Sequence, residues 1–386
     1  MLRAGSQSSG TMIELDVICR RASVRRQAGE ELLLATVVRI EGSSYRRPGA
    51  RMLVGHESWL SGCVSGGCLE DDVVRRAEFR LRGARAVVAR YDSMSDDEIG
   101  WGFGVGCNGL VEILIERLDE ASPTDPLSFA EECFAREEGG VMATVFVSPE
   151  ESVPVGARLL VRRGVRVASS MGSALEQALS SHVARLDHED SWRTSVVSHE
   201  GFDVFLERVH PVPHVFVLGS RHDASPLIEI ARSVGFRVTV VDRTASLTTR
   251  ERFREADRFV IAKPAELLEL VDAHHTALAV VMSHDYERDR DYLGALLESR
   301  ARYIGMLGPE RRTRRMLAEL AQVGKTDRAP SLDRVHAPVG LAIGAETPGE
   351  IALAIVAEMH AALAGAPAGR LRTRRGPIHP GLDARR

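Results

Sequence analysis

Residues 215–242 read VFVLGSRHDASPLIEIARSVGFRVTVVD, and this stretch decides the fold of the second half of the chain. It holds an apolar strand, a turn at Gly219, a helix that ends near Val234 and a second strand that ends in Asp242. This order is typical of the first unit of a Rossmann fold. Further strands are predicted at residues 258–261, 277–282 and 302–304. We therefore expect a parallel sheet with helices covering it.

The dinucleotide fingerprint of this unit is incomplete. It requires glycine at its first, third and sixth positions, which here hold Gly219, Arg221 and Ala224. Alanine is tolerated at the sixth position, but Arg221 lies where a pyrophosphate needs bare backbone. Arg221, with His222 beside it, can still hold an anion at the start of the next helix.

Two acidic positions extend this candidate site. Asp242 can bond a ribose hydroxyl, but Arg243 beside it can neutralise it, and an acid there can simply end a strand. His284 and Asp285 follow the predicted strand at 277–282, where ligands of parallel sheets collect. They suit an acid–base couple or a metal site, whereas capping of the next helix alone explains Asp285.

Length and composition exclude several classes of protein. A chain of 386 residues is expected to form two or three domains, and 44% hydrophobic with 27% charged residues is typical of a folded globular protein. The net charge of −4 offers no general field for a nucleic acid. The apolar runs are too short for a membrane helix, and the N-terminus has no signal core, so we expect a cytoplasmic protein.

Proline-bearing linkers at 122–126 and 210–213 divide the chain. The expected fold class is α/β: a mixed N-terminal domain built around glycine and cysteine loops, and a Rossmann-like C-terminal domain with a parallel sheet. The expected parts are a flexible leader (1–11), the N-terminal domain (12–121), a small α/β middle segment (122–210), the Rossmann-like domain (211–366) and a basic flexible tail (367–386).

The five cysteines form no C-x-x-C pair and are expected to be thiols. Cys68 follows two glycines at the start of a predicted helix, where a thiol is shifted toward thiolate, although the acids at 70–72 oppose this. Cys107 lies in a second glycine loop. Both can instead be small buried residues, as we expect of Cys19 and Cys133, and Cys63 stays undecided.

Six separate motifs resemble the XdhC/CoxI family. They are EGSSYRRPGARM (41–52), SGGCLE (65–70), GCNG (106–109), SHD (283–285), YIGMLG (303–308) and GLAIGAETP (340–348). Their order and spacing match the family as well. This chain departs from the family at Tyr45, where proline is usual, at Cys63, where serine is commoner, and at Arg221, where the Rossmann loop often has glycine.

The resemblance implies a non-catalytic accessory protein. Members of the family bind the molybdenum cofactor, hold it during sulfuration and deliver it to xanthine dehydrogenase or a related hydroxylase such as carbon monoxide dehydrogenase. A cysteine desulfurase would be a further partner, whereas a homodimer and the choice between the bare molybdopterin cofactor and a dinucleotide stay open. The cofactor contacts expected in the N-terminal domain are Arg51, Ser65, Gly66, Gly67, Cys68 and Cys107, with the two cysteines nearest the molybdenum.

This set of residues fits the ligand chemically. Molybdenum and its dithiolene prefer soft sulfur partners, and N–H groups in glycine turns receive phosphate well. An alternative is an NAD(P)-dependent oxidoreductase that uses the Rossmann domain with His284 as proton donor, against which Arg221 argues. A third is a regulatory scaffold with no ligand.

Overall fold

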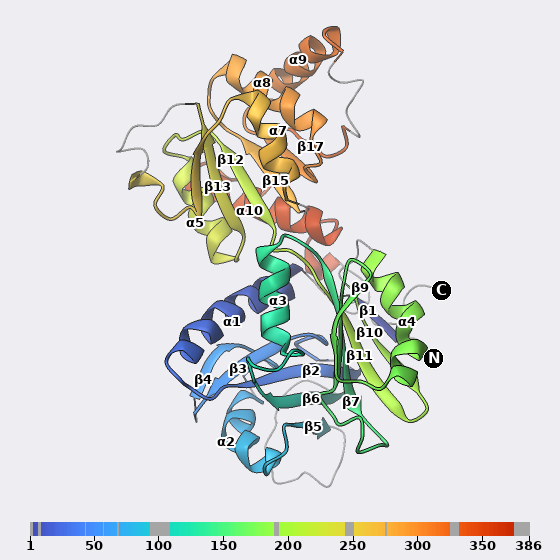
Figure 1. The fold of residues 1–386 in the computed structure, drawn as a ribbon. Coiled ribbons are helices and arrows are strands. Elements are labelled where there is room, and N and C mark those ends of the chain that lie inside the picture. The colour runs from blue at the N-terminus through green and yellow to red at the C-terminus, as the bar shows by residue number, and fades with distance from the viewer. Residues whose placement is uncertain are drawn as a thin grey trace. The chain divides into compact units, whose positions relative to one another are not determined.

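The structure is a computed structural model of the chain. It describes residues 3–6, 9–42, 44–56, 58–67, 69–92, 109–188, 193–243, 251–274, 276–324 and 332–373. The chain divides into two compact units, an N-terminal unit that runs to His210 and a C-terminal unit that begins at Pro211 (Figure 1). This boundary coincides with the second predicted linker. Each unit is described by itself.

The first sheet of the N-terminal unit is antiparallel, with strand order β4-β3-β2-β6-β5. Helix α2 (Glu70–Leu81) packs on one face through apolar side chains at four-residue spacing, Val73, Ala77 and Leu81. Helix α1 (Ser9–Gln27) lies against β3 and β4. The strands are β2 (Leu33–Gly42), β3 (Arg51–Gly55), β4 (Ser58–Gly62), β5 (Ala86–Asp92) and β6 (Gly109–Arg117).

The second sheet of this unit has the order β1-β10-β11-β7-β8-β9, and α4 (Ser173–His188) covers one face. Its core is formed by residues 140–209, within the predicted middle segment. Helix α3 (Pro126–Ala135) precedes it and is capped by Asp125. The strands are β1 (Arg3–Ser6), β7 (Gly140–Val147), β8 (Arg158–Arg162), β9 (Val165–Ser169), β10 (Arg193–His199) and β11 (Phe202–Val209).

The chain start differs from the expected flexible leader. Residues 3–6 form β1, which pairs antiparallel with β10, and α1 already begins at Ser9. An edge strand is held by backbone hydrogen bonds and needs no apolar pattern, so the polar sequence did not signal it.

The two sheets of the N-terminal unit pack face to face. Val38 and Leu114 of the first sheet meet Phe146 and Phe205 of the second, and all four are almost fully buried. Since α2 and α4 cover the outer faces, this part of the unit has four layers, helix, sheet, sheet and helix (Figure 1).

The C-terminal unit contains one parallel sheet with the strand order β14-β13-β12-β15-β16-β17. Counted along the chain from β12, this is the order 3-2-1-4-5-6 of a Rossmann fold. The predicted strands are confirmed, and β17 is an addition. The strands are β12 (His214–Leu218), β13 (Arg237–Asp242), β14 (Arg258–Ile261), β15 (Ala277–Val281), β16 (Tyr303–Met306) and β17 (Val335–His336).

Helices cover both faces of this sheet. Those that pack together are α5 (Ala224–Ser233) with α10 (Pro348–Ala364), α7 (Pro264–Asp272) with α8 (Tyr286–Glu298), and α8 with α9 (Glu310–Gln322). The predicted basic tail is described as far as Thr373, and its residues 371–373 form a short 3-10 helix. Within the described ranges no helix is both long and apolar enough to cross a membrane.

Candidate functional site

The first candidate region is the glycine loop, residues 63–69, which joins β4 to α2. Three of its backbone N–H groups converge on the carboxylate of Glu70, at the start of the helix. Glu70 Oε1 accepts from the N–H of Val64 at 3.0 Å and of Ser65 at 2.7 Å. Glu70 Oε2 accepts from the N–H of Gly67 at 3.1 Å and from Ser65 Oγ. The loop thus encloses a carboxylate of its own chain.

The same loop is braced by the Ser65 side chain and by one glycine conformation. Ser65 Oγ accepts from the Leu69 N–H at 3.1 Å. Gly67 has φ +111°, a region in which a Cβ is strained. Burial raises the pKa of the Glu70 carboxyl, but the hydrogen bonds from Ser65 and Val64 outweigh it, so the pKa is lowered. Glu70 is therefore ionised at neutral pH.

This arrangement changes the expected role of the glycines. Ser65, Gly66 and Gly67 lie together as predicted, but the N–H groups of Ser65 and Gly67 already have an anionic partner. The described part of this region therefore offers a ligand its outer surface and the Cys63 thiol rather than a vacant anion nest. Cys68 and Cys107, the main predicted contacts, lie outside the described residues.

Of the described cysteines, Cys63 is the one in the glycine loop. Its side chain is half-buried, and Sγ lies 4.0 Å from Glu14 Oε1, which in turn belongs to an ion pair with Arg46. Burial raises the pKa of Cys63, so it is a thiol at neutral pH. Cys19 and Cys133 are buried in the core, as expected, and burial raises the pKa of Cys133 to about 12.

Arg51, another predicted contact, lies between the two sheets. Its guanidinium forms an ion pair with Glu207 of β11, and both side chains are almost fully buried. A second buried pair, Arg158 with Glu116 at 2.5 Å, joins the sheets nearby. The two pairs line a small cavity of about 10 Å³, the size of one water molecule. Arg51 is thus positioned to fix the packing of the sheets.

The second candidate region is the carboxyl edge of the Rossmann sheet, between β12 and β15, where the strand order reverses. Gly219 ends β12 with φ +132°. A Cβ at this position would lie 2.6 Å from the carbonyl oxygen of Met282 and 2.8 Å from Cα of Ser283. Only glycine permits this approach, which brings the first turn against the segment that carries His284.

A histidine–aspartate pair lies at this edge. The partner of His284 is Asp223, not the predicted Asp285. His284 Nε2 lies 2.6 Å from Oδ2 of Asp223, in the turn before α5. His284 has φ +61°, an uncommon conformation for a residue with a side chain. Asp285 caps α8 by accepting from the Arg288 N–H at 3.0 Å, and this bond lowers the pKa of Asp285. The capping interpretation of Asp285 explains its position.

Asp242 is also engaged within the chain. Its carboxylate accepts from the Ser220 hydroxyl and from the N–H of Arg243 at 2.6 Å, and Arg288 Nη1 lies 3.6 Å away. A ribose would have to displace Ser220 from the carboxylate. Exposed side chains of Arg221, His222 and Arg243 lie at this edge, and the two arginines carry positive charge.

Asp223 was not among the predicted site residues, yet its carboxylate limits which ligands the start of α5 can bind. Its carboxylate stands at the helix start, where a bound dinucleotide places its pyrophosphate. A second anion there would meet a fixed negative charge, and Arg221 occupies the position that requires bare backbone. The edge therefore brings the predicted residues together but does not fit NAD in its ordinary pose.

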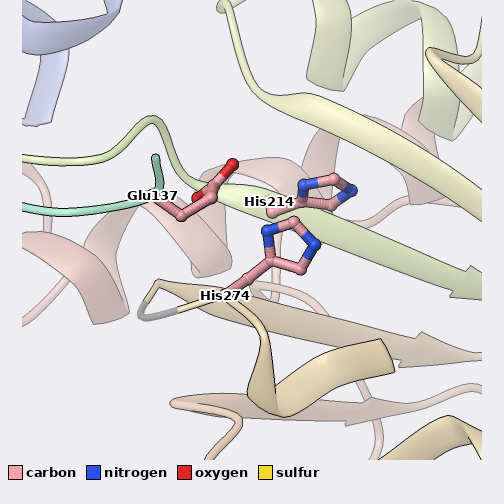
Figure 2. A group of neighbouring side chains, drawn as sticks. All are labelled: Glu137, His214 and His274. Carbon is pink, nitrogen blue, oxygen red and sulfur yellow. The ribbon is translucent and has the colours of Figure 1, made fainter. Parts of the chain in front are cut away.

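Two histidines lie at the opposite edge of this sheet. His214 begins β12 and His274 follows α7, with ring centroids 4.1 Å apart (Figure 2). His214 Nε2 lies 2.7 Å from Oγ1 of Thr239, and its ring stacks on Phe216. Burial lowers the pKa of His214 to about 3, so it is neutral at physiological pH. Glu137, also drawn in Figure 2, belongs to the other unit.

Comparison with known proteins defines the class to which this fold and these loops belong. A profile described as the XdhC and CoxI family matches residues 25–92, and the XdhC Rossmann domain matches residues 215–359. A Bacillus subtilis relative, described as a probable xanthine dehydrogenase subunit, is 32% identical over 335 residues, 86% of this chain and 92% of the relative. The chain belongs to the XdhC and CoxI family.

Two further relatives span nearly the whole chain. The Escherichia coli protein "Molybdenum cofactor insertion chaperone PaoD" is 23% identical over 342 residues, 89% of this chain and 86% of PaoD. A crystal structure from Bacillus halodurans, described as a xanthine dehydrogenase, is 26% identical with a TM-score of 0.71 and covers 95% of this chain and 98% of its own. The resemblance drawn from the six motifs is thus confirmed.

Proposed function

We propose that this protein binds the molybdenum cofactor and delivers it to a molybdenum hydroxylase, as an accessory protein without turnover of its own. The observation that carries the proposal is the match to PaoD, which extends over both units rather than over a single glycine motif. The description of the Bacillus subtilis relative points to the same enzyme class.

The glycine loop would hold the cofactor through cysteine sulfur and through contacts with the surface of the loop. Cys68 and Cys107 would be the soft partners of the molybdenum, since thiolates suit this metal. Ser65, Gly66 and Gly67 would form the adjoining wall in the conformation that Glu70 maintains. The N–H groups of Val64, Ser65 and Gly67 already donate to Glu70, so a phosphate would not find them free.

The Rossmann edge of the C-terminal unit is a separate candidate region for phosphate contacts. Arg221 and Arg243 carry the charge that a phosphate needs, and His222 beside Arg221 can hydrogen-bond to it. Gly219, Asp242, His284 and Asp285 would shape the surface around it. Whether the cargo is the bare cofactor or a dinucleotide, whether it is sulfurated by a cysteine desulfurase, and whether the protein acts as a dimer belong to the same proposal and require separate measurements.

The alternative, an NAD(P)-dependent oxidoreductase, has less support. His284 would be its proton donor, but that imidazole is bound to Asp223, and Asp223 stands where the pyrophosphate would lie. The family membership also gives no independent reason for hydride transfer.

The test is to express the protein in cells that make molybdopterin and to measure what it retains. Oxidation converts the bound pterin to a fluorescent product, mild acid releases any nucleotide, and cyanide releases a terminal sulfur ligand as thiocyanate. We expect pterin in the wild type and less in Cys68→Ala and Cys107→Ala, with Cys133→Ala as the buried-thiol control. Absence of pterin, together with saturable NADH binding by the same preparation, would overturn the proposal.

A further inference from the structure

Two exposed aromatic side chains border the glycine loop. In the part of the chain that the structure describes, three aromatic residues are exposed: Tyr45 (69%), Trp59 (59%) and Phe79 (64%). Phe79 is covered by the guanidinium of Arg82, 4.4 Å from its ring centroid. Among the described residues, no guanidinium lies over the ring of Tyr45 or Trp59. Tyr45 rests against Gly66 and Trp59 is bonded to Gly62, so both border one loop, which sets them apart from scattered surface residues.

Tyr45 is the closer of the two to the centre of the loop. A Cβ built on Gly66 would lie 3.4 Å from Cγ of the Tyr45 ring, 3.5 Å from Cδ1 and 3.8 Å from Cδ2. The base of the ring therefore rests against Gly66, while most of the ring faces solvent. A side chain longer than that of glycine at position 66 would push the ring off the loop.

Trp59 lies at the start of the loop. Its Nε1 donates to the carbonyl oxygen of Gly62 at 2.7 Å, so the indole is fixed against the backbone just before Cys63. The half-buried thiol of Cys63 follows Trp59 by four residues and precedes Gly66, the glycine that the Tyr45 ring contacts, by three. A small surface thus combines an aromatic platform, a glycine backbone and sulfur.

We infer that Tyr45 is a stacking platform for the planar pterin ring of the ligand, a role that rests on the proposed function. A flat heteroaromatic ring gains most from an aromatic face that is already held in place, since little side-chain freedom is lost on binding. The alternative occupant, a protein partner, would need roughly 800 Å² of surface, far more than one ring provides. The occupant that matches this surface is therefore a small planar ring.

The test compares Tyr45→Ala, Tyr45→Phe and Phe79→Ala in the full-length protein. The probe is the fluorescent oxidised derivative of molybdopterin, which keeps the pterin ring, and its quenching gives a dissociation constant. Loss of one stacking partner typically weakens binding by roughly tenfold, so Tyr45→Ala is expected to raise Kd by about that factor. Tyr45→Phe keeps the ring and should stay within about twofold, as should Phe79→Ala.

The outcomes separate this inference from the proposed function. If the wild type binds the probe and retains pterin but Tyr45→Ala binds it equally well, the stacking role is refuted and the proposed function stands. If the wild type neither binds the probe nor retains pterin, both fall. If Tyr45→Ala binds normally but delivers less cofactor to the hydroxylase, the ring is a partner contact and the inference is likewise overturned.

Discussion

Replacement of Glu70 by glutamine is expected to loosen the glycine loop without removing any apolar contact. The glutamine carbonyl can still accept from the N–H groups of Val64 and Ser65. Its NH2 group, however, would face the N–H of Gly67 and the hydroxyl of Ser65, so donors would oppose donors. Two charge-assisted hydrogen bonds are lost, and the loop loses the anion at its centre.

The magnitude follows from those two bonds. Hydrogen bonds to a charged group contribute about 1.5–3 kcal/mol each, but Gly67 is exposed and water can replace part of the loss, so we expect about 2–3 kcal/mol in the free energy of unfolding. For a unit of this size that corresponds to a decrease in Tm of about 4–12 °C. All three tryptophans lie in the N-terminal unit, so intrinsic fluorescence reports its unfolding separately.

The pH dependence gives a second readout. The folded pKa of Glu70 is lowered, so the carboxylate stabilises the fold above its unfolded pKa, and this contribution disappears as the pH falls through the folded pKa. Wild type and Glu70→Gln should therefore differ at pH 7 and converge in acid. Asp71→Asn is the control, because Asp71 is in the same helical turn but its side chain is 83% exposed. Equal Tm values for the two variants at pH 7 would refute the reasoning.

Two further predictions concern buried groups. Arg51→Ala removes the ion-pair partner of the buried Glu207 carboxylate and should cost about 3–5 kcal/mol in tryptophan-monitored urea unfolding, whereas Arg51→Met with Glu207→Leu should recover much of it; an equal loss in both would contradict this. His214 has a folded pKa of about 3 against its usual 6.5, so the unfolded chain binds the proton first and stability falls below pH 6.5, by about 2 kcal/mol at pH 5. Calorimetry of the C-terminal unit should show this slope, and His214→Phe should lack it.

The sequence predicts the Rossmann sheet well because each central strand is an apolar run between turns. Residues 277–281, for example, are fully buried on both faces and read as a continuous apolar segment. Strand β17 has only two residues, and its position is set by pairing with β16, so it has no pattern of its own. Strand β1 is likewise positioned by its pairing with β10 and has no apolar pattern of its own.

The sequence shows which residues belong to the candidate sites, but not which of them contact one another. Glycine turns, Asp242 and His284 could be located because each follows a predicted strand. The partner of His284 could not, since Asp223 precedes it by 61 residues and meets it only through the order of the strands. Glu70 is recognisable as an acid near a helix dipole, whereas its role as acceptor depends on how residues 64–67 turn back over it. A loop that bends toward a nearby acid leaves no periodic signal.

In the glycine loop, finally, the N–H groups of Val64, Ser65 and Gly67 have Glu70 as their acceptor before any ligand arrives. If such a loop became ordered only around a bound phosphate, its loss of conformational entropy would weaken ligand binding. Here the loop becomes ordered when the chain folds, so the same entropy loss lowers the folding stability instead. Loaded and empty forms would then present the same loop surface to a partner. The partner would have to sense the cargo itself, and release would require no refolding of the carrier.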